Sequence, residues 1–164
     1  MQRVVIYKID ENEKVIYNLG FLLEKLCMAG KKIAVFCAED NIQQIDKALW
    51  TFSTNCFVPH DIASENGKND LQPALLSANL NDFHVREIIC VFSLDDLRSL
   101  VNNEDIANEI NDAIFITHDD LNSVVEQVKN ICPVANVDIF KKTQGKWEKA
   151  MFWWNAKSRK IIFS

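Results

Sequence analysis

The first forty residues alternate between two hydrophobic patterns, and this alternation constrains the fold more than any other feature of the chain. Residues 4–9 and 33–37 are short runs rich in β-branched residues, which is the pattern of buried strands. Between them, over about 13–29, apolar residues recur at intervals of three and four and stop before Gly30, as in an amphipathic helix. Strand, helix and strand in this order predict a βαβ unit with two parallel strands.

The rest of the chain repeats the two patterns. We expect helices over 41–51, from Ser93, over 105–110 and over 119–131, with Asn41 as N-cap of the first and Ile42, Ile45 and Leu49 facing inward. We expect strands at 56–58, ended by Pro59, at 87–92, 113–117 and 134–140, and an edge strand within 63–81. Gly145 is expected to turn the last strand back into residues 147–154 as a hairpin.

This order predicts a doubly wound α/β fold, with a mostly parallel sheet covered by helices on both faces. It resembles a mononucleotide-binding fold without a nucleotide site. We expect one domain over 1–164, with a core over 1–140 and a C-terminal hairpin extension over 141–164. No signal peptide and no membrane span are indicated, so a cytoplasmic protein is expected.

The extension differs from the core in charge. From Lys141 to Lys160 there are seven basic residues and one acid, Glu148, so this segment carries +6 while the chain as a whole carries −5. The asymmetry suggests an acidic or phosphate-bearing partner, although a solvated lysine face would give the same pattern. The aromatic residues interleaved with these lysines could also stack on single-stranded nucleic acid, or pack a plain hairpin against the sheet; they are Trp147, Phe152, Trp153 and Trp154.

No residue pattern indicates catalysis, a cofactor or a metal. The first strand-to-helix turn, IDENEK, lacks the glycines with which a phosphate cradle is built. The three histidines are far apart, the five cysteines form no CxxC pair, and no serine lies in a GxSxG elbow. We expect the cysteines to be reduced core thiols.

A phosphoacceptor regulator of the receiver class has the same architecture and is the alternative from another functional class. It would bind a metal through Asp10 and Glu11, accept the phosphoryl group on Asp61 and use the hydroxyl of Thr117. Its usual lysine is replaced here by His118.

Residues 45–63, IDKALWTFSTNCFVPHDIA, carry a more specific motif. A helix ending in Ala-Leu-Trp at Trp50, a short gap and the run Phe-Val-Pro-His at 57–60 resemble the chi subunit family of DNA polymerase III. The resemblance implies a non-catalytic accessory subunit that would be described as part of a DNA polymerase complex. It implies two partners: a psi-like subunit of the clamp loader and the acidic C-terminal tail of single-stranded DNA-binding protein.

The resemblance also suggests where these partners bind. The clamp-loader side is expected to involve the motif residues Trp50, Phe57, Val58, Pro59 and His60, although a core position for Trp50 and Phe57 is equally open. The family holds the tail with an Arg…aromatic-Lys run on the last helix, of which only Lys129 is present, beside Val125 and Val128. Longer members carry a Gly-x-Trp-Glu-Lys run like that at 145–149, so the tail is expected at Lys129, Lys146, Trp147 and Lys149.

Overall fold

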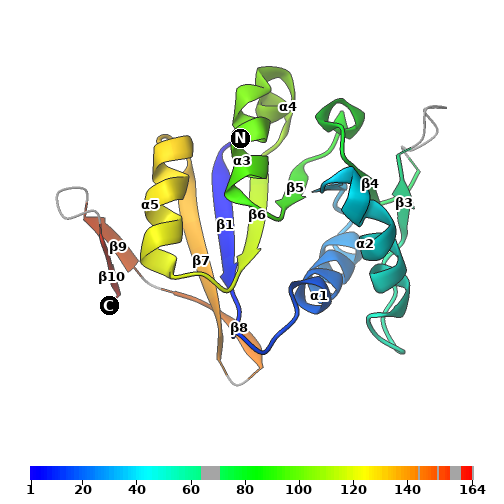
Figure 1. Cartoon of the computed structure of the whole chain (residues 1–164), viewed down its shortest axis with the longest axis horizontal. Helices are drawn as coiled ribbons and strands as arrows, with labels where there is room; N and C mark the ends of the chain where they lie inside the picture. The colour runs from blue at the N-terminus through cyan, green and yellow to red at the C-terminus, as the bar shows by residue number, and fades with distance from the viewer. Residues whose placement is uncertain (64–70, 144, 151, 156–159, 164) are drawn as a thin grey trace.

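The computed structural model describes residues 1–63, 71–143, 145–150, 152–155 and 160–163, the last two ranges as backbone only. The elements follow in the order β1 (Arg3–Lys8), α1 (Val15–Met28), β2 (Ile33–Phe36), α2 (Glu39–Thr51), β3 (His60–Ile62), β4 (Ala74–Ser77), the 3-10 helix η1 (Leu80–Phe83), β5 (Ile88–Val91), α3 (Leu94–Asn102), α4 (Glu104–Glu109), β6 (Asp112–Thr117), α5 (Leu121–Ile131), β7 (Asn136–Thr143), β8 (Lys146–Lys149), β9 (Phe152–Asn155) and β10 (Lys160–Phe163). The alternation of strands and helices predicted from the sequence is confirmed (Figure 1).

The main sheet has eight strands in the order β3-β4-β2-β5-β6-β1-β7-β8. All neighbouring strands are parallel except the last pair, in which β8 runs antiparallel to β7. The two strands of the first βαβ unit are parallel, as expected, and β6 and β5 lie between them. A separate antiparallel pair, β9 and β10, lies beside α5 (Figure 1).

Helices cover both faces of this sheet, as the doubly wound prediction requires. Strand β1 shows why: Val4 and Ile6 belong to the apolar cluster under α3, α4 and α5, whereas Val5 belongs to the cluster under α1 and α2. Successive residues of a strand point to opposite faces, so an uninterrupted apolar run suits a strand that is buried on both sides.

Two predicted boundaries in the middle of the chain are wrong. Helix α2 begins at Glu39 with Ala38 as its N-cap, and Asn41 lies in its first turn. Glu39 and Asp40 suit this earlier start because carboxylates are stabilised by the positive end of a helix dipole. The strand expected at 56–58 is a loop; β3 begins at His60, directly after Pro59, which has no N–H to donate to a sheet.

The expected edge strand within 63–81 is also placed differently. Residues 74–77 form β4, which lies between β3 and β2, and its four residues are buried, so β3 is the edge. At the other edge Gly145, with φ 78°, turns β7 back into the hairpin as predicted. The returning segment is not one strand over 147–154: β8 ends at Lys149, and β9 pairs with β10 instead.

Candidate functional site

The motif at 45–63 forms an exposed aromatic surface at the β3 edge of the sheet. Trp50 comes from the last turn of α2 and Phe57 from the following loop, and their ring centroids are 5.4 Å apart. Trp50 is 56% exposed and Phe57 54%, which excludes the core position left open for them. Exposed aromatic side chains of this kind are frequent anchors in protein interfaces. We call Trp50 and Phe57 the aromatic platform.

Buried groups support the platform from beneath. The His60 ring lies 5.0 Å from the Trp50 ring, and its Nδ1 donates to the Val58 carbonyl at 2.6 Å. Its Nε2 is 3.3 Å from Asp46 Oδ1, but the direction of approach is not that of a hydrogen bond. Val58 and His60 are buried and Pro59 is half-buried. Of the five predicted clamp-loader residues, Trp50 and Phe57 therefore offer contact area and the others hold them in place.

A second cluster of aromatic and basic side chains lies at the opposite edge of the sheet, on β1, β7 and β8. The Tyr7 and Phe140 rings stack at 5.1 Å, and Trp147 meets Tyr7 edge-on at 4.9 Å. The Lys142 ammonium is 5.7 Å from the Trp147 ring centroid, a cation–π distance. Lys142 and Trp147 are cross-strand partners in the hairpin, so both project from the same face.

Lys142 also connects the hairpin to the start of α1. Its ammonium donates to Glu13 and, at 3.1 Å, to Asn18 Oδ1. The hydrogen bond from Lys142 holds the pKa of Glu13 below its ordinary value. Beside this contact is a cavity of about 470 Å³ whose lining includes Lys14, Tyr17, Phe21 and Lys142. We call this cavity the α1–hairpin groove; it combines two cations and the acid Glu13 with two aromatic rings.

The four residues predicted to hold an acidic tail do not form one site. Lys146, Trp147 and Lys149 share β8, with Lys146 exposed and Lys149 paired to Asp138 at 2.8 Å. Lys129 donates to the Ala135 carbonyl at 2.8 Å, next to the start of β7, whereas Lys146 pairs with Thr143 at its end. Eight strand residues separate these ends by roughly 26 Å. The side chains of Phe152, Trp153 and Trp154 lie outside the described residues, so single-strand binding through them stays a prediction.

The residues of the receiver alternative are also separated. Asp10 and Glu11 follow β1, whereas Asp61 lies within β3, five strand positions away in the sheet, or about 24 Å. Metal-binding carboxylates must meet at one ion, so this arrangement does not support a phosphoacceptor site. Thr117 Oγ1 donates to Asp119 Oδ2 at 3.1 Å instead. Within the described part of the chain, no three His, Cys, Asp or Glu residues are grouped as a metal site.

Sequence reasoning missed most of the α1–hairpin groove. Tyr17 and Phe21 lie on α1 and Lys14 is its N-cap, far along the chain from Lys142, and no short motif joins them. The signal that was available is the exposed positions of Tyr17 and Phe21 at a spacing of four residues on the predicted helix, which places them on one face.

By its fold the described part of the chain has doubly wound α/β architecture, and its turns after β1, β2 and β5 contain no glycine. Exposed aromatic side chains lie at the β3 edge of the sheet and exposed lysines at the β8 edge. Residues 1–136 match the family model of the DNA polymerase III chi subunit, HolC. The chain therefore belongs to this family of accessory subunits of DNA polymerase III, as the motif at 45–63 suggested. No curated protein matches the chain. No helix within the described residues is long and apolar enough to cross a membrane.

Proposed function

We propose that the chain is a cytoplasmic adaptor that links the clamp loader to single-stranded DNA-binding protein. A psi-like clamp-loader subunit binds the aromatic platform, and the acidic C-terminal tail of single-stranded DNA-binding protein binds the α1–hairpin groove. Membership of the chi family supports the accessory role. The pairing of lysines with aromatic rings in the groove supports the assignment of the tail.

The chemistry of the groove suits a peptide that is acidic and ends in an aromatic residue. Lys14, which is exposed, attracts the carboxylates, whereas Lys142 is already paired with Glu13 of the same lining; Tyr17 and Phe21 provide apolar area for a terminal ring. The last helix offers no such surface at the two positions where the family carries arginine and an aromatic residue. Val125 and Val128 are fully buried against the sheet, which favours a displaced site.

The positions of the two surfaces suit an adaptor. The platform lies at the end of α2, and the groove lies between the start of α1 and β7. Phe21 of the groove packs against Phe52, two residues after Trp50, so the two surfaces are separate neighbours and an adaptor would hold its two partners close together.

The tail assignment is tested by calorimetry with a peptide copying the C-terminus of single-stranded DNA-binding protein and with the same peptide lacking its last two residues. We expect saturable binding of the complete peptide only, weakened about fivefold or more by Lys14→Ala, since a charged contact contributes on the order of 1 kcal/mol. Lys25→Ala is the matched control, because Lys25 is an exposed lysine further along the same helix. If Lys129→Ala abolishes binding while Lys14→Ala has no effect, the tail binds at α5 and the groove assignment is wrong.

The clamp-loader assignment is tested by gel filtration with the cognate clamp-loader subunits. We expect Trp50→Ala combined with Phe57→Ala to abolish co-elution and to leave tail binding unchanged, because neither aromatic residue lines the groove. Met28→Ala is a suitable control, since Met28 is 83% exposed and lies away from the platform motif in the sequence. Co-elution that survives loss of both aromatic rings would contradict the assignment.

A further inference from the structure

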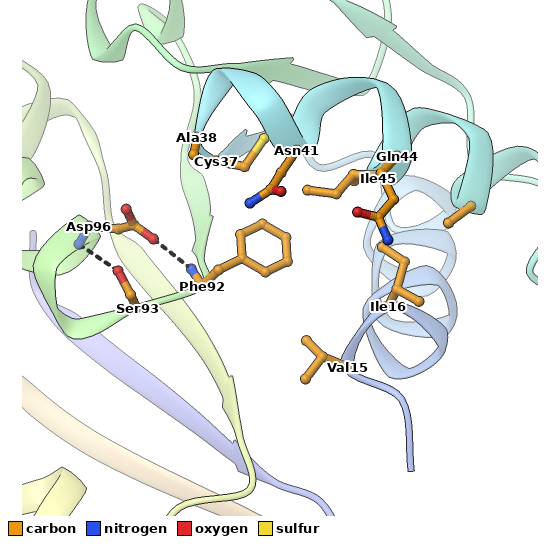
Figure 2. Close-up of a pocket in the computed structure, with 11 residues that line it drawn as sticks. Val15, Ile16, Cys37, Ala38, Asn41, Gln44, Ile45, Phe92, Ser93 and Asp96 are labelled. Atoms are coloured by element: carbon orange, nitrogen blue, oxygen red, sulfur yellow. Dashed lines mark hydrogen bonds between the residues drawn. The ribbon is translucent and has the colours of Figure 1, made fainter.

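A cleft that neither partner assignment uses lies between α1, α2 and the start of α3 (Figure 2). Its volume is about 490 Å³. Cys37 and Ala38, which follow β2, and Phe92 and Ser93, which follow β5, lie at its base. The cleft is therefore located at the carboxyl ends of two neighbouring parallel strands.

This location is the topological switch point of the sheet. After β2 the chain continues into α2 on one face, and after β5 it continues into α3 on the other. The two helices diverge and leave a crevice between them, which is where doubly wound proteins commonly bind ligands.

The inner surface of the cleft is apolar with two polar groups on one wall. Val15, Ile16 and Phe92 point toward its centre (Figure 2). The side-chain amides of Asn41 and Gln44, from successive turns of α2, also point inward (Figure 2). Neither amide makes a hydrogen bond to any other residue that the structure describes. A ligand with an apolar group and amide-like donors and acceptors would satisfy both features.

Charge at the rim selects among such ligands. Both helices begin at the cleft with acidic first turns, Glu39 and Asp40 on α2 and Asp95 and Asp96 on α3. Asp96 is held at the rim by accepting from Phe92 N at 3.2 Å while its own N–H donates to Ser93 Oγ at 3.0 Å (Figure 2). None of the described lining residues is basic. Asp95 is paired with Arg98, whereas Glu39, Asp40 and Asp96 offset the positive ends of the two helix dipoles. The rim therefore does not favour phosphates or carboxylates as bare helix N-termini would, and cationic groups are attracted.

We infer that the cleft is a third docking site, which binds a short basic segment of a protein partner through one apolar side chain. The apolar side chain enters between α1 and α2, the segment's main chain pairs with the amides of Asn41 and Gln44, and flanking Lys or Arg residues face the acidic rim. This site is distinct from the aromatic platform, because the helical spacing of Asn41, Gln44 and Ala48 places them on one side of α2 and Trp50 on the opposite side. Its acidic rim also gives it the opposite charge preference to the α1–hairpin groove, which is proposed to bind an acidic tail.

The test uses the full chain, labelled with ¹⁵N, and three tripeptide amides as probes. Acetyl-Lys-Phe-Lys-amide carries the anchor and the cations, acetyl-Glu-Phe-Glu-amide reverses the charge, and acetyl-Lys-Gly-Lys-amide removes the anchor. We expect saturable amide shifts over 37–44 and 92–96 with the first probe and at least about fivefold weaker binding of the other two, as a difference of about 1 kcal/mol predicts. Equal binding of all three probes, or no shift with any of them, would overturn the inference.

A cavity-filling variant ties the signal to the cleft. Ala48 is a half-buried lining residue, so Ala48→Leu should occupy part of the cleft and abolish binding of the first probe. Lys47→Leu, at the exposed neighbouring position, should leave it intact. Binding that Ala48→Leu leaves unchanged would show that the peptide sits elsewhere. Adenosine in place of the peptide is the further arm: saturable adenosine binding with no peptide binding would identify a nucleoside site and refute the peptide assignment.

Discussion

Gly20→Ala should destabilise the protein, although an alanine is the better helix former. Gly20 lies within α1, where it is buried. A Cβ atom added there would lie 2.6 Å from Phe52 Cδ2 and 2.7 Å from Phe52 Cγ. Phe52 is 5% exposed and its ring packs edge-on against Phe21 at 5.3 Å, so the ring has little room to withdraw.

The magnitude follows from two opposing terms. Helix propensity alone favours alanine over glycine by about 1 kcal/mol. Carbon atoms in contact prefer a separation of about 3.5 Å or more, so Phe52 must retreat by nearly 1 Å, and overpacking of this kind costs about 1–3 kcal/mol. Since the clash includes Cγ, close to the backbone, a rotation of the ring cannot relieve it. We expect a net loss of about 1 kcal/mol in the free energy of unfolding.

Urea unfolding of four proteins measures this: wild type, Gly20→Ala, Phe52→Ala and the double variant. Because alanine at position 52 removes Cγ and the whole ring, alanine at position 20 should be neutral or stabilising in the Phe52→Ala background. The change in the free energy of unfolding caused by Gly20→Ala should thus differ, in sign or by about 1 kcal/mol, between the protein with Phe52 and the protein without its ring. Refutation would be a Gly20→Ala protein that is as stable as wild type or more stable, because propensity would then outweigh the contact.

Three further outcomes follow from buried or paired groups. Arg86 is 1% exposed and donates to the carbonyls of Ile33, Gln72 and Pro73 at 3.2, 3.0 and 2.7 Å. Arg86→Met should therefore lower the free energy of unfolding by about 2–4 kcal/mol, and a loss below about 0.5 kcal/mol in urea unfolding would contradict this. Burial raises the pKa of the Cys90 thiol to about 12, so iodoacetamide at pH 8 should spare it in the folded protein and modify it in urea, as peptide mass analysis would show. The hydrogen bond from Lys142 lowers the pKa of Glu13 below its ordinary value of 4.5. The stabilisation that this contact gives is therefore complete above pH 4.5 and is lost as the pH falls through the lowered pKa. Lys142→Met should reduce the urea midpoint at pH 7 and have a smaller effect at pH 3.

The elements of the fold were predictable because their signals are local. Strands such as β1 and β6 are apolar runs and helices such as α1 and α5 are amphipathic stripes, and both patterns are visible within ten to fifteen neighbouring residues. The errors fall where local signals are weak: β3 and β4 are three and four residues long, and β4 owes its buried position to the strands on either side of it.

The candidate surfaces divide in the same way. The aromatic platform was found from the sequence because Trp50, Phe57 and His60 lie within eleven residues and form one recognisable motif. Their exposure could not be predicted, since a tryptophan in the last turn of a helix packs inward or outward according to what covers that face. The tertiary structure decided it by burying Val58 and His60 beneath the ring.

By itself, the sequence determined the class of fold, the turn at Gly145 and the membership of the chi family, because each of these depends on residues close together in the chain. Only the tertiary structure decided that Lys142 meets Glu13, that Trp147 meets Tyr7, and that Lys129 and Lys146 lie at opposite ends of β7. These contacts depend on strand order, and strand order is set by the packing of helices on two faces of a sheet. No local pattern in the chain encodes it.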